Sequence, residues 1–238
     1  MKLEGKRAIV LGGTAGIGLA AADQMQAQGA EVVAVSRTAT QRPTARETLG
    51  AGATLRDVDV LDRDQLTRLF DEFAPFDVLI CSATGGERAI GPFLEMDLDG
   101  FQGSFRKLWG YTNAVRIGVP RMSNDGAVVL VSGYPARKAS PGAAAISTVG
   151  NAVEGFARAI APEIAPRRIN VVSPGAIATE MFAMDPETRD KVLAQMTQNM
   201  LIPRAGTADE VAQAILFVVT NDFVTGTTVD VDGGALLP

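Results

Sequence analysis

A regular alternation of short apolar runs with longer helical patterns constrains the fold of this sequence more than any other feature. The apolar runs are rich in Val and Ile and carry almost no polar alternation, which is typical of strands buried on both faces. Parallel strands need a long crossover between them, and a helix usually supplies it. We therefore predict an α/β fold: a single doubly wound domain over residues 1–238, with a parallel seven-stranded sheet and helices on both faces.

The predicted elements follow from these runs. Strands are expected over residues 7–12, 31–36, 53–60, 76–82, 127–132, 169–175 and within 227–234. Helices are expected between the first two strands, over about 101–117, from about 146 onward and over 208–219. Pro162 lies inside the third of these helices and is expected to kink it, because proline cannot donate a backbone hydrogen bond.

Composition excludes several classes of protein. The net charge is −5 and no Lys/Arg run is present, which argues against a nucleic-acid or anionic-membrane partner. No uncharged run reaches membrane-spanning length, and no long apolar stretch precedes the first strand, so neither a membrane span nor a signal peptide is expected. We expect a cytoplasmic protein that acts on a small molecule.

Histidine is absent and Cys81 is the single cysteine. This excludes His-based catalytic triads and His metal ligands, so no metal site is predicted. One cysteine cannot form an internal disulfide, which suits a reducing compartment. Cys81 is expected to pack as a small apolar residue.

The stretch "VLGGTAGIGLA" follows the first predicted strand and opens the first predicted helix. Gly12 permits a tight turn, Gly16 lets the backbone approach a pyrophosphate, and Gly18 allows close packing of helix on strand. A pyrophosphate would lie at the helix N-terminus, where free N–H groups point outward. The strand–turn–helix context makes this a predicted dinucleotide site.

The spacing of these glycines resembles the short-chain dehydrogenase/reductase family, in its "classical" size class with a Rossmann fold. The segments "SPGAIAT" (173–179) and "FVTGTTVDVDGG" are similar to other family landmarks, and the resemblance spans essentially the whole chain. It implies strand order 3-2-1-4-5-6-7, a dinucleotide across the carboxyl ends of the strands, and a homodimer or homotetramer. It also implies cofactor contacts from Gly12, Thr14, Gly16, Ile17, Gly18, Asp59, Val60, Ser82, Ala83, Pro174, Gly175, Ile177 and Thr179.

The end of the second strand indicates which dinucleotide is bound. An acidic residue there would hold the ribose 2′-OH of NAD, but this chain has Ser36, Arg37 and Thr38. A guanidinium can pair with a 2′-phosphate through two parallel N–H donors. We therefore predict that NADP(H) is favoured over NAD(H), with these three residues at the site. A solvated Arg37 without a ligand is the alternative.

Tyr134 and Lys138 have the four-residue spacing of the family's catalytic pair, but their context argues against that role. In the family, Tyr and Lys lie on one face of the helix after the fifth strand, where the ammonium lowers the phenol pKa. Pro135 and Pro141 bracket this pair, so a loop is expected. In a loop the spacing does not align the side chains.

The stretch "NAVEGFARAIAPEIAP" (151–166) resembles the family's catalytic helix and sets the register. That register places Ile146 at the Tyr position and Gly150 at the Lys position, and neither can donate a proton. The family's Ser position falls on Gly133, beside Ser132, and its Asn position falls on Lys107. The resemblance thus implies a kept cofactor site and a degenerate catalytic tetrad.

Few groups are available to replace the missing donor. The candidate catalytic residues are Ser132, Tyr134 and Lys107, and Tyr134 is the expected donor if the protein is redox-active. Each also has a structural alternative: Tyr134 as a pocket wall and Lys107 as a surface charge. Tyr111 is expected to be a core or interface ring.

Three functions remain open at this point. The first is an NADP(H)-dependent oxidoreductase acting on a carbonyl/alcohol or an activated C=C, with weak activity on simple ketones. The second is a non-redox lyase or isomerase on the same scaffold, and the third is a catalytically silent binding protein.

Residues 180–206 resemble the family's variable substrate lid. Four methionines lie in this region, which favours an apolar substrate, although a lid helix packed on the body would account for them equally. They are Met181, Met184, Met196 and Met200.

Overall fold

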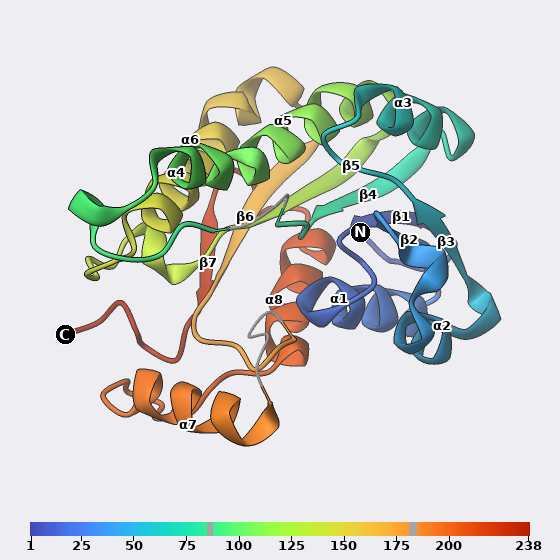
Figure 1. Ribbon diagram of the computed structural model, residues 1–238. Helices are drawn as coiled ribbons and strands as arrows, with labels where there is room; N and C mark the ends of the chain where they lie inside the picture. Colours follow the sequence, from blue (N-terminus) through green and yellow to red (C-terminus); the bar gives the residue numbers. More distant parts are fainter. Residues whose placement is uncertain (85–87, 181–184) are drawn as a thin grey trace.

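The computed structural model describes residues 1–84, 88–180 and 185–238, and it is built around one parallel sheet (Figure 1). The seven strands follow the order β3-β2-β1-β4-β5-β6-β7, and every neighbouring pair is parallel. This confirms the predicted doubly wound α/β fold and strand order. The strands are β1 (Arg7–Leu11), β2 (Glu31–Ser36), β3 (Ala53–Asp57), β4 (Phe76–Cys81), β5 (Met122–Val131), β6 (Arg168–Pro174) and β7 (Thr228–Val231).

Helices cover both faces of the sheet (Figure 1). One layer consists of α1 (Gly16–Ala27), α2 (Pro43–Leu49) and α8 (Ala208–Thr220); the other consists of α3 (Arg63–Glu72), α5 (Arg106–Gly118) and α6 (Ala144–Ile164). Successive strand residues point to opposite faces, so neighbours such as Val10 and Leu11 enter different cores. Both faces of the central strands are therefore buried, as their apolar composition predicts.

The helix α7 (Pro186–Thr197) stands away from the two layers (Figure 1). The segment that contains it leaves and rejoins the body at one place. Ala178 N donates to Gly206 O at 2.9 Å, and Gly206 N donates to Ala176 O at 2.9 Å. Met196 lies on α7 and is partly exposed, whereas Met181 and Met184 lie outside the described residues.

Several predicted boundaries are wrong. The helix expected over 101–117 is two elements, α4 (Leu98–Ser104) and α5, which meet at Phe105. The Asp97 side chain starts α4 early because it accepts hydrogen bonds from Asp99 N and Gly100 N. The third strand ends at Asp57 rather than at residue 60, and the fifth begins at Met122 rather than at 127.

Pro162 does not interrupt α6, which continues to Ile164. The proline falls in the last turn, where its missing N–H removes little of the hydrogen-bond ladder. Among the described residues, no helix combines the length and the apolar character needed to cross a bilayer.

Candidate active site

The glycine loop between β1 and α1 packs tightly against the chain after β4. Gly12 has φ 84°, and a Cβ there would lie 2.7 Å from Ala83 N. A Cβ on Gly18 would lie 2.1 Å from Gly12 O. Only glycine fits at either position, so the two residues act as the sequence predicts: one turns the chain, and the other lets the helix approach the strand.

The N-terminus of α1 offers backbone donors to a ligand. The helix begins at Gly16, and the preceding Ala15 makes no side-chain cap to its first turn. The first N–H groups of a helix have no partner within the helix and favour an anion. A Cβ on Gly16 would lie 3.4 Å from the Thr179 side chain, so the segment after β6 lies against this loop.

The end of β2 carries a buried hydroxyl that lacks a partner. Ser36 Oγ is shielded from solvent and has no hydrogen-bond partner in the described part of the chain. The next residue, Arg37, is exposed and forms no ion pair with the described residues. The loop that follows is fixed because Thr40 donates from N (2.8 Å) and Oγ1 (2.6 Å) to Asp57.

The other predicted cofactor residues border the same edge of the sheet. Ser82 N donates to Leu11 O at 2.8 Å, and Gly175 N donates to Val231 O at 2.9 Å. Asp59 accepts from Leu61 N at 2.9 Å, which shapes the turn after β3. The side chains of Thr14, Val60, Pro174 and Ile177 are buried.

The residues present fit a dinucleotide. The glycine cradle would be filled by any Cβ, the start of α1 is uncapped by a side chain, and the buried Ser36 hydroxyl lacks a partner. These features lie along the β1–β2 carboxyl edge, where dinucleotides bind in doubly wound sheets.

A nearby cavity of about 260 Å³ lies where the α7 segment joins the body, lined by Gly175, Ile177, Arg204 and Glu210 among others. A larger hollow lies beside β3 and α3 at the outer edge of the sheet.

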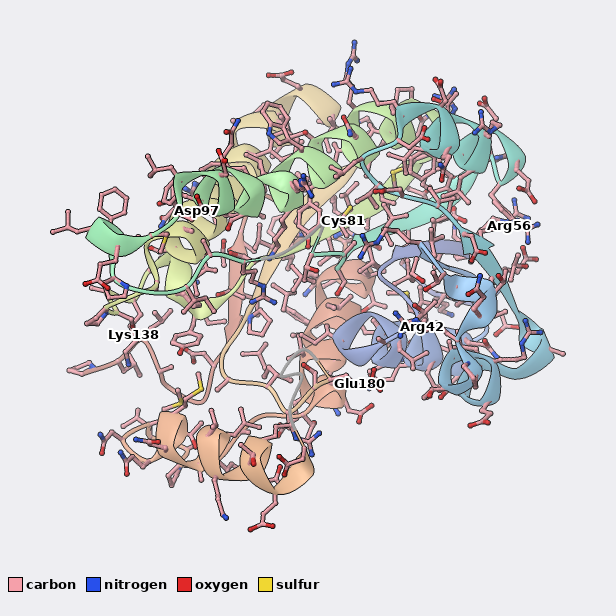
Figure 2. The ribbon with its side chains drawn as sticks, viewed as in Figure 1. Arg42, Arg56, Cys81, Asp97, Lys138 and Glu180 are labelled. Carbon is pink, nitrogen blue, oxygen red and sulfur yellow. The ribbon has the colours of Figure 1, made fainter. Side chains whose placement is uncertain are left out.

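Tyr134 and Lys138 do not form a pair. Tyr134 opens a short 3-10 turn, η5 (Tyr134–Ala136), and Lys138 Nζ donates to Ala235 O at 2.5 Å. Lys138 thus ties this loop to the C-terminal segment, beside which it lies in Figure 2. Burial raises the pKa of the Tyr134 phenol, which is the opposite of the effect of a paired ammonium.

The η5 turn packs against Gly150, the position that the predicted register assigns to the family's lysine. A Cβ on Gly150 would lie 2.8 Å from Ala136 Cβ and 3.3 Å from Ser132 Oγ. Asn151 Nδ2 donates to Ala136 O, which holds the turn against α6. The Ser132 hydroxyl lies 3.3 Å from Gly150 O, within hydrogen-bond reach as a donor. It is therefore engaged with α6.

A buried charge network that the sequence did not predict supports this region. Glu154 on α6 is only 3% exposed and lies 3.4 Å from Ser132 Oγ and 3.3 Å from Arg137 Nε. Arg137 also forms an ion pair with Asp230 on β7. The available signal was the position of Glu154, one turn after Gly150 on a helix with a buried face, but its partners come from distant parts of the chain.

Lys107 reaches the end of β5 from the start of α5. Its Nζ donates to Ser132 O at 3.1 Å and lies 5.7 Å from the centre of the Tyr111 ring. Burial, aided by the nearby Arg88 guanidinium, lowers the pKa of Lys107 to about 7. Lys107 is therefore not the surface charge that was the alternative interpretation.

Two other expectations about this region are confirmed. Tyr111 is a core ring, 1% exposed, whose hydroxyl donates to Val131 O at 3.1 Å. Cys81 is fully buried at the end of β4, near the centre of the molecule in Figure 2, and burial raises the pKa of its thiol. In the described ranges, no cluster of carboxylate or thiol groups suited to a metal ion is found.

Comparison with known proteins assigns the chain to a family. A model of the family described as enoyl-(acyl carrier protein) reductase matches residues 12–235. The short-chain dehydrogenase/reductase ATR9 of Stachybotrys chlorohalonatus is 30% identical, covering 99% of this chain and 98% of its own. The 3-oxoacyl-[acyl-carrier-protein] reductase FabG of Haemophilus influenzae is 29% identical, covering 99% of this chain and 100% of its own.

Comparison with solved structures leads to the same family. A small-chain dehydrogenase in complex with NADPH has a TM-score of 0.86 at 29% identity, covering 99% of this chain and 100% of that one. A second short-chain dehydrogenase/reductase family protein has a TM-score of 0.87 at 32% identity over the whole of both chains. The chain therefore belongs to the short-chain dehydrogenase/reductase family of oxidoreductases.

Proposed function

We propose that this protein is an NADP(H)-dependent oxidoreductase that reduces a carbonyl or an activated C=C with a rebuilt acid site. The observation that carries the proposal is the cofactor cradle, in which the glycine loop, the uncapped start of α1 and the Ser36–Arg37 step lie on one edge. The NADPH complex of a similar structure supports the choice of cofactor. When bound, the dinucleotide supplies the hydride.

The chain's own residues would hold and orient the dinucleotide. Gly12 to Gly18 would hold the pyrophosphate, Asp59 and Val60 would border the adenine, and Ser82, Ala83 and the 174–179 segment would flank the nicotinamide. Arg37 would pair with the 2′-phosphate. The acid site would draw on Ser132, Tyr134 and Lys107, which follow or border the end of β5.

Residues 180–206 would form a lid over a small, apolar substrate in a single-domain enzyme. The pinned ends of this segment at Ala178 and Gly206 support a discrete lid. We further propose a cytoplasmic homodimer or homotetramer, as the family resemblance implies.

One observation favours a second candidate, a catalytically silent dinucleotide-binding protein or a non-redox lyase or isomerase. The Ser132 hydroxyl is engaged with α6, and the place of the family's lysine is filled by Ala136. A protein of this kind would bind NADPH without oxidising it.

The test is a fluorescence titration with NADPH and NADH, followed by turnover against a panel of ketones, aldehydes and enones. We expect NADPH to bind more tightly, and Arg37→Asp to weaken NADPH by about 10–100-fold while sparing NADH, since hydrogen bonds to charged groups contribute ~1.5–3 kcal/mol. Arg116→Asp, an equal charge change at an exposed site on α5, is the control. Equal affinities for the two cofactors would contradict the NADPH preference, and tight binding without turnover on the panel would favour the silent protein.

A further inference from the structure

A half-buried amine without a carboxylate partner lies at the carboxyl edge of β5. Lys107 Nζ donates to Ser132 O, and in the part of the chain that the structure describes it forms no ion pair. Burying an unpaired ammonium is costly, because neither water nor an anion compensates its charge. Groups held in this way beside a ligand crevice are candidates for function.

The surrounding contacts fix this amine in place. Lys107 and Tyr111, one helical turn apart on α5, donate to the carbonyls of consecutive residues, Ser132 and Val131. The Tyr111 hydroxyl is thereby committed to the core. An ammonium has three donors, so after the bond to Ser132 O others remain for an oxygen placed in the crevice.

The groups around Lys107 are of two kinds. The Arg88 guanidinium disfavours the positive charge of the lysine, and the other charged and titratable groups leave that charge unchanged. Arg88, from the segment before α4, lowers the lysine pKa by repulsion, and Tyr111 and Cys81 have raised pKa values and stay neutral. Glu154 of α6 faces the Ser132 hydroxyl, and Lys107 binds the carbonyl of the same residue. The pKa of about 7 lets the ammonium donate a proton near neutrality.

We propose that Lys107 is the proton donor of this enzyme, in place of the family's tyrosine. The proposal rests on the proposed reductase function and takes as substrate a ketone, aldehyde or enone whose oxygen becomes negative on reduction. Tyr134 is the rival, but burial raises its pKa and makes it the weaker acid.

The proton step balances as follows. Hydride from NADPH adds to carbon, and the C=O electron pair moves to oxygen. An N–H bond of the Lys107 ammonium breaks as the O–H bond forms, leaving a neutral amine and NADP⁺. Water then returns a proton to the amine. In an enone the same ammonium would protonate the enolate oxygen, and the enol would then convert to the ketone in solution.

The test compares Lys107→Met with the wild-type protein. We expect NADPH affinity to stay within threefold and kcat for reduction to fall by ~10²–10⁴-fold, the usual contribution of acid–base catalysis. In the wild type, kcat should be constant below pH 7 and fall as the pH rises through about 7, because the ammonium is the active form. The Lys107→Met variant should lose this fall.

Two further variants separate catalysis from packing. Lys107→Arg keeps the charge and the donors but scarcely releases a proton, so it should remain slow and lack the decline in kcat above pH 7. Tyr111→Phe removes the neighbouring tie to β5 and should lower the Tm while leaving kcat within threefold. If Lys107→Met and Tyr111→Phe lowered the Tm alike and both kept kcat, a structural role for Lys107 would replace the proposal.

A readout independent of turnover is an NMR titration of the Lys107 side chain. We expect a midpoint near 7, and a midpoint near the ordinary value of about 10.4 would overturn the assignment. A loss of activity in Tyr134→Phe but not in Lys107→Met would assign the donor to Tyr134. A wild-type protein that binds NADPH but reduces nothing in the panel would overturn the reductase function as well, whereas normal turnover in Lys107→Met would overturn only this inference.

Discussion

The glycine loop after β1 and the η5 turn after β5 each pack against a glycine that has no Cβ, Gly18 in the first case and Gly150 of α6 in the second. Different groups occupy the space left by the two missing side chains. At Gly18 the space is taken by the backbone of Gly12, which brings α1 close to the sheet and turns its first N–H groups outward. At Gly150 the space is taken by Ala136, a residue of the protein's own loop. One glycine thus leaves backbone donors facing outward, and the other lets a neighbouring loop pack onto its helix.

Of the substitutions that test this difference between the two glycines, one at Gly18 should have the largest effect. A Cβ there would lie 2.1 Å from Gly12 O, and backbone on both sides cannot yield without moving the loop. Gly18→Ala should abolish NADPH binding at any practical concentration and lower the free energy of unfolding by more than ~3 kcal/mol, at or beyond the upper end of overpacking costs. Titration by fluorescence and thermal unfolding would measure both effects.

Gly103→Ala is the matched control, because nothing lies within 4 Å of a Cβ at that helical position. It should bind NADPH normally and be slightly stabilised, since alanine is the better helix former. A Gly18→Ala variant that still bound NADPH would show that the loop is not the cofactor site.

A second, smaller effect is expected when Tyr and Lys are introduced at the two positions that the predicted register assigns to the family's pair. Gly150→Lys together with Ile146→Tyr should not create a fast enzyme, because the new side chain meets Ala136 and must displace η5. We expect a loss of ~1–3 kcal/mol in stability from overpacking at Gly150. Gly155→Lys, at a position of α6 with nothing within 4 Å of its Cβ, should keep or slightly raise stability, because lysine is a better helix former than glycine. A large gain in kcat from the double variant would show that η5 yields easily.

A third effect, similar in size to the second, concerns the charge network beneath η5. Arg137→Met leaves Arg158, at 3.8 Å, as the remaining cation paired with the buried Glu154 carboxylate among the described residues. Removing one partner of a fully buried pair costs ~3–5 kcal/mol, and the 34% exposure of the Arg137 side chain reduces this to about 2 kcal/mol. Urea unfolding would measure the loss.

The double variant Arg137→Met with Glu154→Gln provides the control for this network. Part of the lost stability should return, because the uncompensated charge is removed together with its partner. Strictly additive losses would mean that the two side chains do not stabilise each other.

The sequence predicted those features that depend on local patterns. The bounds of β2 (Glu31–Ser36) and the glycine loop follow from apolar runs and turn residues close together in the chain, whereas the strand order was expected from the family resemblance. The loop character of Tyr134–Lys138 also followed from two prolines. These signals are short-range, so one sequence suffices to interpret them.

Other features depend on contacts between distant residues and could not be predicted. The early start of α4 depends on the Asp97 cap, whose strength cannot be judged from propensity alone. The closure of the Gly150 space by Ala136, and the link from Arg137 to Asp230, need the packed structure. The low pKa of Lys107 likewise arises from burial against β5, which its place at the start of a helix does not reveal.

The meeting of the two ends of the α7 segment has a consequence for how this protein can diversify. Ile177 pairs with Gly206 in an isolated parallel bridge, so the intervening chain begins and ends at almost the same point in space. Such a segment can be lengthened, shortened or exchanged without cutting a strand of the sheet or moving the glycine loop. The region is an exchangeable segment with fixed attachment points, and its sequence could change while the sheet and the glycine loop are inherited unchanged.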